Sequence, residues 1–201
     1  MSVLVEPAAL RLAAAVLLLS PYVPLLFMGE EYGETNPFLY FVSHRDADLI
    51  QAVREGRRRE FAAFGWEGDV PDPQSESSFA DSRLDWGRAG NGSHARLRAL
   101  YTDLLKIRKQ EPALRPGSAS VSVKHSESDQ WISLRLVATG SELIAGFNFG
   151  SVEGTLPLES GGSHAAILVT DDPRYGGEGK SAVTSTGLRL SARSAALLRQ
   201  L

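Results

Sequence analysis

Two carboxylates and a group of aromatic rings follow a short apolar run near the N-terminus. The run Pro-Leu-Leu-Phe-Met at 24–28 stops at Gly29, and Glu30 and Glu31 come directly after it. Aromatic side chains then follow closely: Tyr32, Phe38, Tyr40 and Phe41. A buried strand that delivers acids and rings at its carboxyl end is how a (β/α)8 barrel builds its active-site rim. Such a rim suits a sugar, because a pyranose has an apolar face and a ring of hydroxyls.

The two acids are poor candidates for a catalytic pair. Neighbouring side chains on extended backbone project to opposite sides, so Glu30 and Glu31 cannot easily flank one glycosidic bond. The rings allow two interpretations: Phe38, Tyr40 and Phe41 form a stacking platform for glucose, or they are core anchors at alternating spacing. The residues alone therefore identify no catalytic acid, and they leave the binding role of the rings open.

Metal, cofactor and nucleotide chemistry find no support in the chain. Its four histidines lack the spacing of a zinc site: His44, His94, His125 and His164. The acidic residues around the glycine turn at 171–179 lack the spacing of an EF-hand, which favours a plain turn. No P-loop, Gly-x-Gly-x-x-Gly or Gly-x-Ser-x-Gly pattern occurs. We therefore expect no metal site and no cofactor.

The bulk composition is that of an ordinary globular protein. The 201 residues are 43% hydrophobic and 22% charged, with a net charge of −3. Such a balance gives no support for binding nucleic acid or an anionic membrane. The arginines within 54–59 alternate with Glu55 and precede Glu60, which favours an ion-paired or solvated helix face. Because cysteine is absent, disulfides are excluded and a reducing compartment fits, so we predict a cytoplasmic protein.

The apolar run at 12–19 could also be read as a leader peptide. Only one positive charge, Arg11, precedes it, and Glu6 stands nearby. Ser-Pro-Tyr-Val-Pro follows at 20–24 in place of a small-residue cleavage site. Because two of these residues are prolines, the run is also a poor membrane span. A helix over 8–19 that is buried on several sides is the better interpretation.

Helix and strand patterns divide the chain into an α/β part and an all-β part. After the helix over 8–19 we predict a strand over 24–28, a helical region over 43–64 that Gly56 breaks or bends, and a loop over 65–91. The expected anchors of that loop are Phe79, Leu84 and Trp86. Ser43 and Asp46 resemble a capping pair for the second helix.

A clear amphipathic helix over 93–110 precedes the change to strand periodicity. Its apolar face holds five residues: Leu97, Leu100, Tyr101, Leu104 and Leu105. Pro116-Gly117 marks a domain boundary, and residues beyond it alternate with a period of two. Strands are predicted over 119–124, 132–138, 142–149, 165–170, 183–190 and 194–201. Several short strands with frequent turns indicate an antiparallel β-sandwich.

Several motifs resemble the α-amylase superfamily of glycoside hydrolases. Leu-Leu-Phe-Met-Gly-Glu-Glu-Tyr-Gly-Glu at 25–34 is similar to the eighth barrel strand of that superfamily. Asn-Pro-Phe-Leu-Tyr-Phe at 36–41 and Arg-Glu-Gly-Arg-Arg-Arg-Glu-Phe at 54–61 resemble its malto-oligosyltrehalose trehalohydrolase subfamily in particular. Further similar motifs are Ser-Arg-Leu-Asp-Trp at 82–86, Gly-Phe-Asn-Phe at 146–149 and Asp-Pro-Arg-Tyr-Gly-Gly-Glu-Gly at 172–179. The resemblance covers essentially the whole chain.

The resemblance implies a retaining hydrolase that cleaves the α-1,4 bond next to the trehalosyl end of maltooligosyltrehalose and releases trehalose. In that family an aspartate nucleophile follows the fourth barrel strand, a glutamate acid follows the fifth, and a second aspartate belongs to an Asn-His-Asp motif after the seventh. Retention requires two carboxyl groups about 5 Å apart. No Asn-His-Asp occurs here, so we predict no catalytic residue in this chain and no hydrolysis by the chain alone.

The resemblance also implies a fold and a set of partners. Residues 1–115 would be the last helix–strand–helix units of a (β/α)8 barrel, with a long insertion after the eighth strand, and residues 116–201 a C-terminal β-sandwich. The implied substrate-binding residues are Glu30, Glu31, Phe38, Tyr40 and Phe41. The partners would be an α-glucan such as maltooligosyltrehalose and the missing N-terminal barrel segment. Without that segment, 8–19 and 24–28 would expose an apolar patch and cause association.

Two alternatives remain. The chain could be a non-catalytic carbohydrate-binding or assembly piece that docks onto a separate partial barrel. It could also be a secreted β-sandwich protein with a cleaved leader. Affinity for a starch-type glucan without turnover would favour the first alternative, and a mature N-terminus beyond residue 24 would favour the second.

Overall fold

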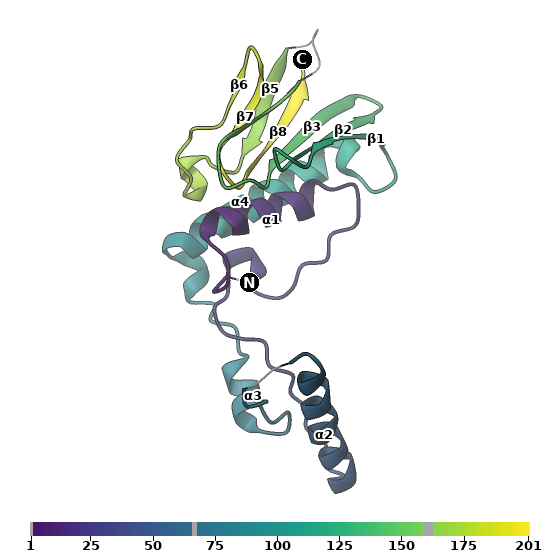
Figure 1. Cartoon of the computed structure of the whole chain (residues 1–201), viewed down its shortest axis with the longest axis vertical. Coiled ribbons are helices and arrows are strands. Elements are labelled where there is room, and N and C mark those ends of the chain that lie inside the picture. The colour runs from purple at the N-terminus through teal and green to yellow at the C-terminus, as the bar shows by residue number, and fades with distance from the viewer. Residues whose placement is uncertain (1, 66–67, 159–162) are drawn as a thin grey trace. The chain divides into compact units, whose positions relative to one another are not determined.

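The computed structural model describes residues 2–65, 68–158 and 163–201, which form two compact units (Figure 1). The first unit, called the sheet unit, contains residues 2–34 and 86–201. The second, called the loop unit, contains residues 35–85. The described helices are α1 (Pro7–Leu19) and α4 (Gly92–Gln110) in the sheet unit, and α2 (Ala47–Ala63) and α3 (Glu76–Asp81) in the loop unit.

Every strand pair of the sheet unit is antiparallel, as the alternating sequence pattern predicts. A five-stranded sheet has the order β1-β2-β3-β8-β5, and a three-stranded sheet has the order β4-β7-β6. The strands are β1 (Ser120–Ser126), β2 (Trp131–Ala138), β3 (Ser141–Asn148), β4 (Gly154–Leu156), β5 (His164–Val169), β6 (Ala182–Thr184), β7 (Gly187–Leu190) and β8 (Ser194–Gln200). The sequence prediction missed β4 and merged β6 with β7, because a turn at 185–186 separates two very short strands.

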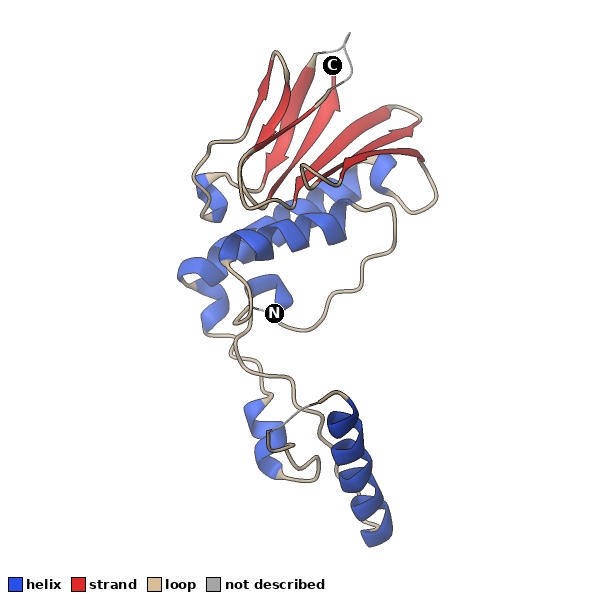
Figure 2. Ribbon diagram, viewed as in Figure 1, coloured by secondary structure: helices blue, strands red, loops and turns tan. Residues whose placement is uncertain are grey.

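Helices α1 and α4 lie against each other on one face of the five-stranded sheet (Figures 1 and 2). Pro7 begins α1 at a position where the missing N–H costs nothing. The helix is apolar on most sides because α4 covers one side and strands β3 and β8 cover another. Fully buried leucines of this core are Leu18, Leu19, Leu100, Leu104, Leu114, Leu136, Leu143 and Leu197. Each contributes about 2 kcal/mol through removal of its side chain from water.

The three-stranded sheet meets the other face of the five-stranded sheet in a smaller apolar cluster. Its buried residues are Trp131, Ile144, Leu156, Leu188, Leu190, Ala196 and Leu198. Gly146 on β3 permits the close approach of the two sheets, because a Cβ at that position would lie 2.6 Å from a methyl carbon of Leu188. The five-stranded sheet is therefore covered on both faces, by helices on one and by strands on the other.

One arginine forms hydrogen bonds with the backbone carbonyls at the carboxyl end of α1. Arg108 of α4 donates hydrogen bonds to the carbonyls of Leu18 (2.7 Å) and Ser20 (2.8 Å), and to that of Tyr22. The last carbonyls of a helix have no partner within the helix, so a cation placed there stabilises it. Arg108 therefore fixes both the end of α1 and the start of the segment that follows.

The glycine turn after β5 is organised by a buried carboxylate. Asp171 is 4% exposed, and its Oδ2 accepts hydrogen bonds from Lys180 N–H (3.0 Å), Ser181 N–H (3.1 Å) and Ser191 Oγ (2.6 Å). Gly177 packs so closely that a Cβ on it would lie 1.9 Å from the carbonyl oxygen of Asp171. The turn predicted here is present, within a loop that these hydrogen bonds and the close packing of Gly177 hold together.

The predicted strand at 24–28 is wrong for this structure. No strand is formed there, and the strand pairs of residues 2–65, 68–158 and 163–201 all lie between 120 and 200. Tyr22, Val23, Leu25 and Phe27 are exposed, and Leu25 has 86% of its surface in contact with solvent. A strand needs neighbours for its backbone groups, and the local sequence does not supply them. The expected exposure of apolar side chains is thus present at 24–28 and includes Tyr22 and Val23, whereas the predicted exposure of helix 8–19 is wrong because α1 packs into the core.

Other local predictions need correction in the region of 46–105. Asp46 alone caps α2, by accepting from Leu49 N–H, and the helix continues through Gly56 without interruption. The predicted loop contains α3. Its expected anchors are not buried: Phe79 and Trp86 are exposed, and Leu84 is half-buried. Leu105 is also exposed, at the margin of the buried face of α4.

Candidate functional site

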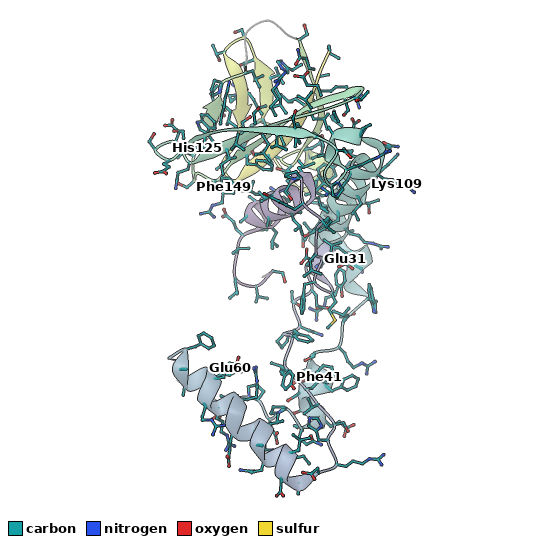
Figure 3. The ribbon with its side chains drawn as sticks, turned by 90° about the vertical axis from the view of Figure 1, so that its right-hand side faces the viewer. Glu31, Phe41, Glu60, Lys109, His125 and Phe149 are labelled. Atoms are coloured by element: carbon teal, nitrogen blue, oxygen red, sulfur yellow. The ribbon has the colours of Figure 1, made fainter. Side chains whose placement is uncertain are left out.

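The five residues predicted to bind substrate fall into both units. Glu30 and Glu31 belong to the sheet unit, whereas Phe38, Tyr40 and Phe41 belong to the loop unit. Figure 3 labels Glu31 in the first group and Phe41 in the second. The structure brings residues together within each group, so we describe the two groups separately.

Glu30 is a bracing residue on a tight turn. It begins a 3₁₀ turn (Glu30–Tyr32) between Gly29 and Gly33, which have φ values of 82° and 72°. Its Oε2 accepts a hydrogen bond from Phe27 N–H (2.9 Å), and its Oε1 accepts one from the hydroxyl of Tyr101 (3.2 Å). Because both oxygens are engaged within the protein, this carboxylate holds the turn against α4. Glu31 is half-buried beside it.

The acidic turn changes the chemistry of Tyr101. Burial raises the pKa of its hydroxyl above the ordinary value of 10.0, and the charge of Glu30, the hydrogen bond to Glu30 and the charge of Glu31 add to this effect. A phenolate beside two carboxylates is unfavourable because like charges repel at short distance. Tyr101 is therefore a hydrogen-bond donor and not a base at neutral pH.

Replacement of Tyr101 by Phe should reduce the loss of stability at high pH. A raised pKa means that the folded protein keeps a proton that the unfolded chain loses, so this stabilisation is complete below about pH 10 and is lost as the pH rises above it. Unfolding by urea at about pH 8 and about pH 11 should show a smaller decrease for Tyr101→Phe than for the unmodified protein. Tyr22→Phe, at an exposed tyrosine, is the matched control and should behave like the unmodified protein. Equal decreases in all three proteins would contradict the assigned environment.

A third carboxylate near the turn, that of Glu34, was not among the predicted site residues. The Glu34 side chain is 6% exposed and lies 3.7 Å from Arg88. It accepts a hydrogen bond from the hydroxyl of Tyr32 (2.8 Å), and the Tyr32 ring lies 5.7 Å from that of Trp86 at an angle of 42°. The local sequence gives no signal for this arrangement, because Arg88 and Trp86 are more than fifty residues from Glu34.

The aromatic rings of the loop unit form an edge-to-face chain. Phe38 lies 6.3 Å from Phe41, and Phe41 lies 5.3 Å from Phe79. Tyr40 is turned to a different neighbour, because the Arg57 guanidinium lies 5.1 Å from its ring centre. Phe38 and Phe41 thus act together, whereas Tyr40 faces the helix α2.

Two arginines of α2 form ion pairs, in line with the predicted ion-paired or solvated helix face. Arg54 binds both carboxylate oxygens of Asp72, with the shortest distance at 2.7 Å. Arg57 pairs with Glu60 at 2.5 Å and also lies over the ring of Phe61. The Arg54–Asp72 pair connects α2 to the segment that precedes α3, so it positions that segment within the loop unit.

A pocket of about 470 Å³ opens beside the phenylalanine chain. Its lining residues are Phe41, Val42, Ser43, Gln74, Ser75, Glu76 and Phe79. Of the predicted substrate-binding residues Phe41 contributes to it, and the sequence prediction did not include the residues that come from 74–79. This lining combines apolar and polar side chains, as small-molecule sites do.

No helix within residues 2–65, 68–158 and 163–201 combines the length and apolar character needed to cross a membrane. No group of three or more His, Cys, Asp or Glu side chains within the described ranges is arranged to hold a metal ion.

No family model matches the chain, but individual relatives do. The malto-oligosyltrehalose trehalohydrolase of Rhizobium sp. (strain M-11) is 41% identical over 82% of this chain and 27% of the relative. That of Mycobacterium tuberculosis is 35% identical over 94% of this chain and 30% of the relative. That of Saccharolobus solfataricus is 48% identical over 53% of this chain and 17% of the relative. The chain therefore spans less than a third of the length of these relatives.

Solved structures also match nearly all of this chain but only about a third of their own length. A putative alpha amylase from Salmonella typhimurium matches 98% of this chain and 32% of its own chain, with a TM-score of 0.76 and 32% identity. An alpha-amylase from H. orenii matches with a TM-score of 0.59 at 14% identity, which supports the fold alone. The chain is therefore a homologue of the malto-oligosyltrehalose trehalohydrolases and corresponds to a part of those enzymes, consistent with a C-terminal portion.

Proposed function

We propose that this chain is the C-terminal portion of a glycoside hydrolase that releases trehalose from maltooligosyltrehalose. The observation that carries the proposal is the similarity to trehalohydrolases over as much as 94% of this chain but only 30% of the relative. Residues 1–115 would complete a (β/α)8 barrel, and residues 116–201 would form the β-sandwich domain that follows. The whole would act in the cytoplasm, in line with the absence of cysteine.

The exposed segment at 22–28 supports the barrel part of the proposal. Its side chains are mostly apolar, and Arg108 holds its beginning while Glu30 holds its end. Exposed apolar surface of this kind often marks a site of contact with another protein, a membrane or a ligand. In the intact enzyme the segment would become a strand between neighbouring strands of the barrel, and the acidic turn would then lie at the rim.

In that setting the predicted site residues would have different roles. Glu30 would brace the rim through Tyr101, and Glu31 would face the glucan or its hydrogen-bonding partners. Phe38 and Phe41 would contact sugar rings from the loop unit, and Tyr40 would stabilise the loop through Arg57. The reactive carboxylates would come from the remaining polypeptide, so this chain alone would not hydrolyse the substrate.

Hydrogen exchange tests the missing-neighbour part of the proposal. The chain is mixed with the portion of the Mycobacterium tuberculosis relative that it does not match, and exchange is followed at Val23, Leu25 and Leu26. These amides should exchange rapidly in the chain alone and become protected in the mixture. The amide of Leu197, in the buried core, serves as the control and should be protected in both. Protection of 23–26 in the chain alone, or no change on mixing, would contradict the proposal.

A non-catalytic role in binding carbohydrate is the second candidate. The pocket in the loop unit favours it, because all of its lining comes from residues 41–79. A chain that binds α-glucan but gains no hydrolytic activity with any complementary portion would fit this second function.

A further inference from the structure

We infer that the sheet unit holds a binding site for a small tetrahedral oxyanion, such as a free phosphate ion, formed by Arg11 and Arg96 beside Gly176. Arg11 belongs to α1, Arg96 belongs to α4, and Gly176 follows the 3₁₀ turn η4 (Pro173–Tyr175) in the loop after β5. The inference goes beyond the proposed function, because the site contains none of the predicted substrate-binding residues.

The two guanidinium groups approach the same point of the chain. A Cβ at Gly176 would lie 3.5 Å from Nη1 of Arg96 and 4.0 Å from Nη1 of Arg11. The same Cβ would lie 3.2 Å from Cδ of Arg96, so glycine leaves room for this side chain at the turn. The turn packs on α4, where the hydroxyl of Tyr175 donates to Asp103 (2.7 Å), and α4 packs on α1. All three parts of the site are thus held together within the sheet unit.

The positive charge of the two arginines is not neutralised by the surrounding protein. Neither Arg11 nor Arg96 forms a hydrogen bond or an ion pair with another residue of the described ranges. Arg11 is half-buried, and burial lowers the pKa of its guanidinium. The charges of Asp171 and Glu6 offset this effect only in part. A partly buried cation without a partner is unfavourable, so an anion at this point would stabilise it.

The two carboxylates that act on Arg11 are engaged with other groups. Glu6 forms an ion pair with Arg193. Oδ2 of Asp171 accepts three hydrogen bonds within its own loop, and its Oδ1 is buried and has no hydrogen bond among the described residues. Of these two carboxylates Asp171 alone lacks a cation partner in the described structure. Two arginines therefore leave an excess of positive charge at the site.

The geometry of the donors selects the class of anion. Each guanidinium is a planar fork of N–H groups that binds two acceptor oxygens at once. Two forks that come from different helices require acceptor oxygens that point in different directions. A tetrahedral oxyanion has such oxygens, whereas a carboxylate offers one planar pair. Because the negative charge of Asp171 is close, we expect a weak site with a Kd of about 1 mM.

Inorganic phosphate is the probe, and the complete 201-residue chain is the receptor. Binding is followed through the NMR signal of the Gly176 amide, which should shift and reach saturation with a Kd of about 1 mM. Arg96→Gln and Arg11→Gln should each weaken binding about tenfold, the loss expected for one charged hydrogen-bonding group. Arg96→Lys keeps the charge without the fork and should weaken binding severalfold. Acetate at the same ionic strength should bind more weakly than phosphate.

Arg98→Gln is the matched control, because it removes the same charge from an exposed position of the same helix. It should leave the affinity unchanged. Arg96 is also exposed, so its replacement keeps the test valid even if that of the half-buried Arg11 disturbs the core. No saturable shift at Gly176, equal affinities in Arg96→Gln and Arg98→Gln, or acetate binding as tight as that of phosphate would each overturn the inference. None of these results alters the hydrogen exchange at 23–26, so failure of this site is distinguishable from failure of the proposed function.

Discussion

Gly177→Ala should destabilise the sheet unit by about 3 kcal/mol or more, because the added methyl group would overlap with backbone atoms of Asp171. The new Cβ would lie 1.9 Å from the carbonyl oxygen of Asp171, and a backbone atom cannot move aside as a side chain can. Relief would require the loop to shift, and the shift would break the hydrogen bonds that the buried Asp171 accepts from Lys180, Ser181 and Ser191. Unfolding by urea, followed through far-ultraviolet circular dichroism, measures the effect.

Gly90→Ala provides the control within the same unit. Nothing lies within 4 Å of a Cβ at Gly90, so its stability should change by less than about 1 kcal/mol. If the two variants unfolded at the same urea concentration, the close approach of Gly177 to Asp171 would be refuted. The comparison tests the fold directly, because both changes add the same single methyl group.

Arg108→Met should cost about 3 kcal/mol of the free energy of unfolding, since a charged donor is lost from three carbonyls. Methionine keeps much of the apolar stem, so the loss reports mainly on the hydrogen bonds to Leu18, Ser20 and Tyr22. The change should also release the beginning of segment 22–28, because Tyr22 is its first residue. Urea unfolding gives the stability, and hydrogen exchange at the end of α1 gives the local effect.

Lys109→Met is the control for that variant. Lys109 is the next residue of the same helix and is exposed (Figure 3), so its replacement should change stability by no more than about 0.5 kcal/mol. A similar small effect of Arg108→Met would show that the carbonyls at the end of α1 do not depend on the guanidinium.

The sequence predicts those elements whose stability is decided locally. Residues 8–19 and 93–110 have the periodicity and the stop signals of helices, and α1 and α4 match them closely. The predictions of strands over 132–138 and 142–149 likewise match β2 and β3, whose positions are buried or half-buried because the five-stranded sheet is covered on both faces. In these segments local preference and tertiary packing agree.

The errors occur where the outcome depends on distant partners. Residues 24–28 have the composition of a buried strand but no strand beside them in the described structure, so they stay irregular and exposed. Trp86 and Phe79 have the size of core residues, yet both are exposed. A large apolar residue predicts burial somewhere, and only the complete set of neighbours determines whether that burial occurs within this chain.

In the candidate site too, the sequence predicts the local features and misses the contacts between distant residues. The acidic turn and the aromatic run are visible in the sequence because their members are adjacent. The hydrogen bond from Tyr101 to Glu30 and the contact of Phe41 with Phe79 join residues far apart, and no local pattern predicts them. The pocket was missed for the same reason, since α3 closes it from a segment whose composition is that of a loop.

Release of trehalose from maltotriosyltrehalose by the purified 201-residue chain is the most direct test of the central claim, that the carboxylates which break the bond lie in other polypeptide. The expected result is no release above the rate without protein, with activity appearing only when the complementary portion of a trehalohydrolase is added. Sustained release by the chain alone would contradict the claim, because it would require a nucleophile and an acid among the residues present here.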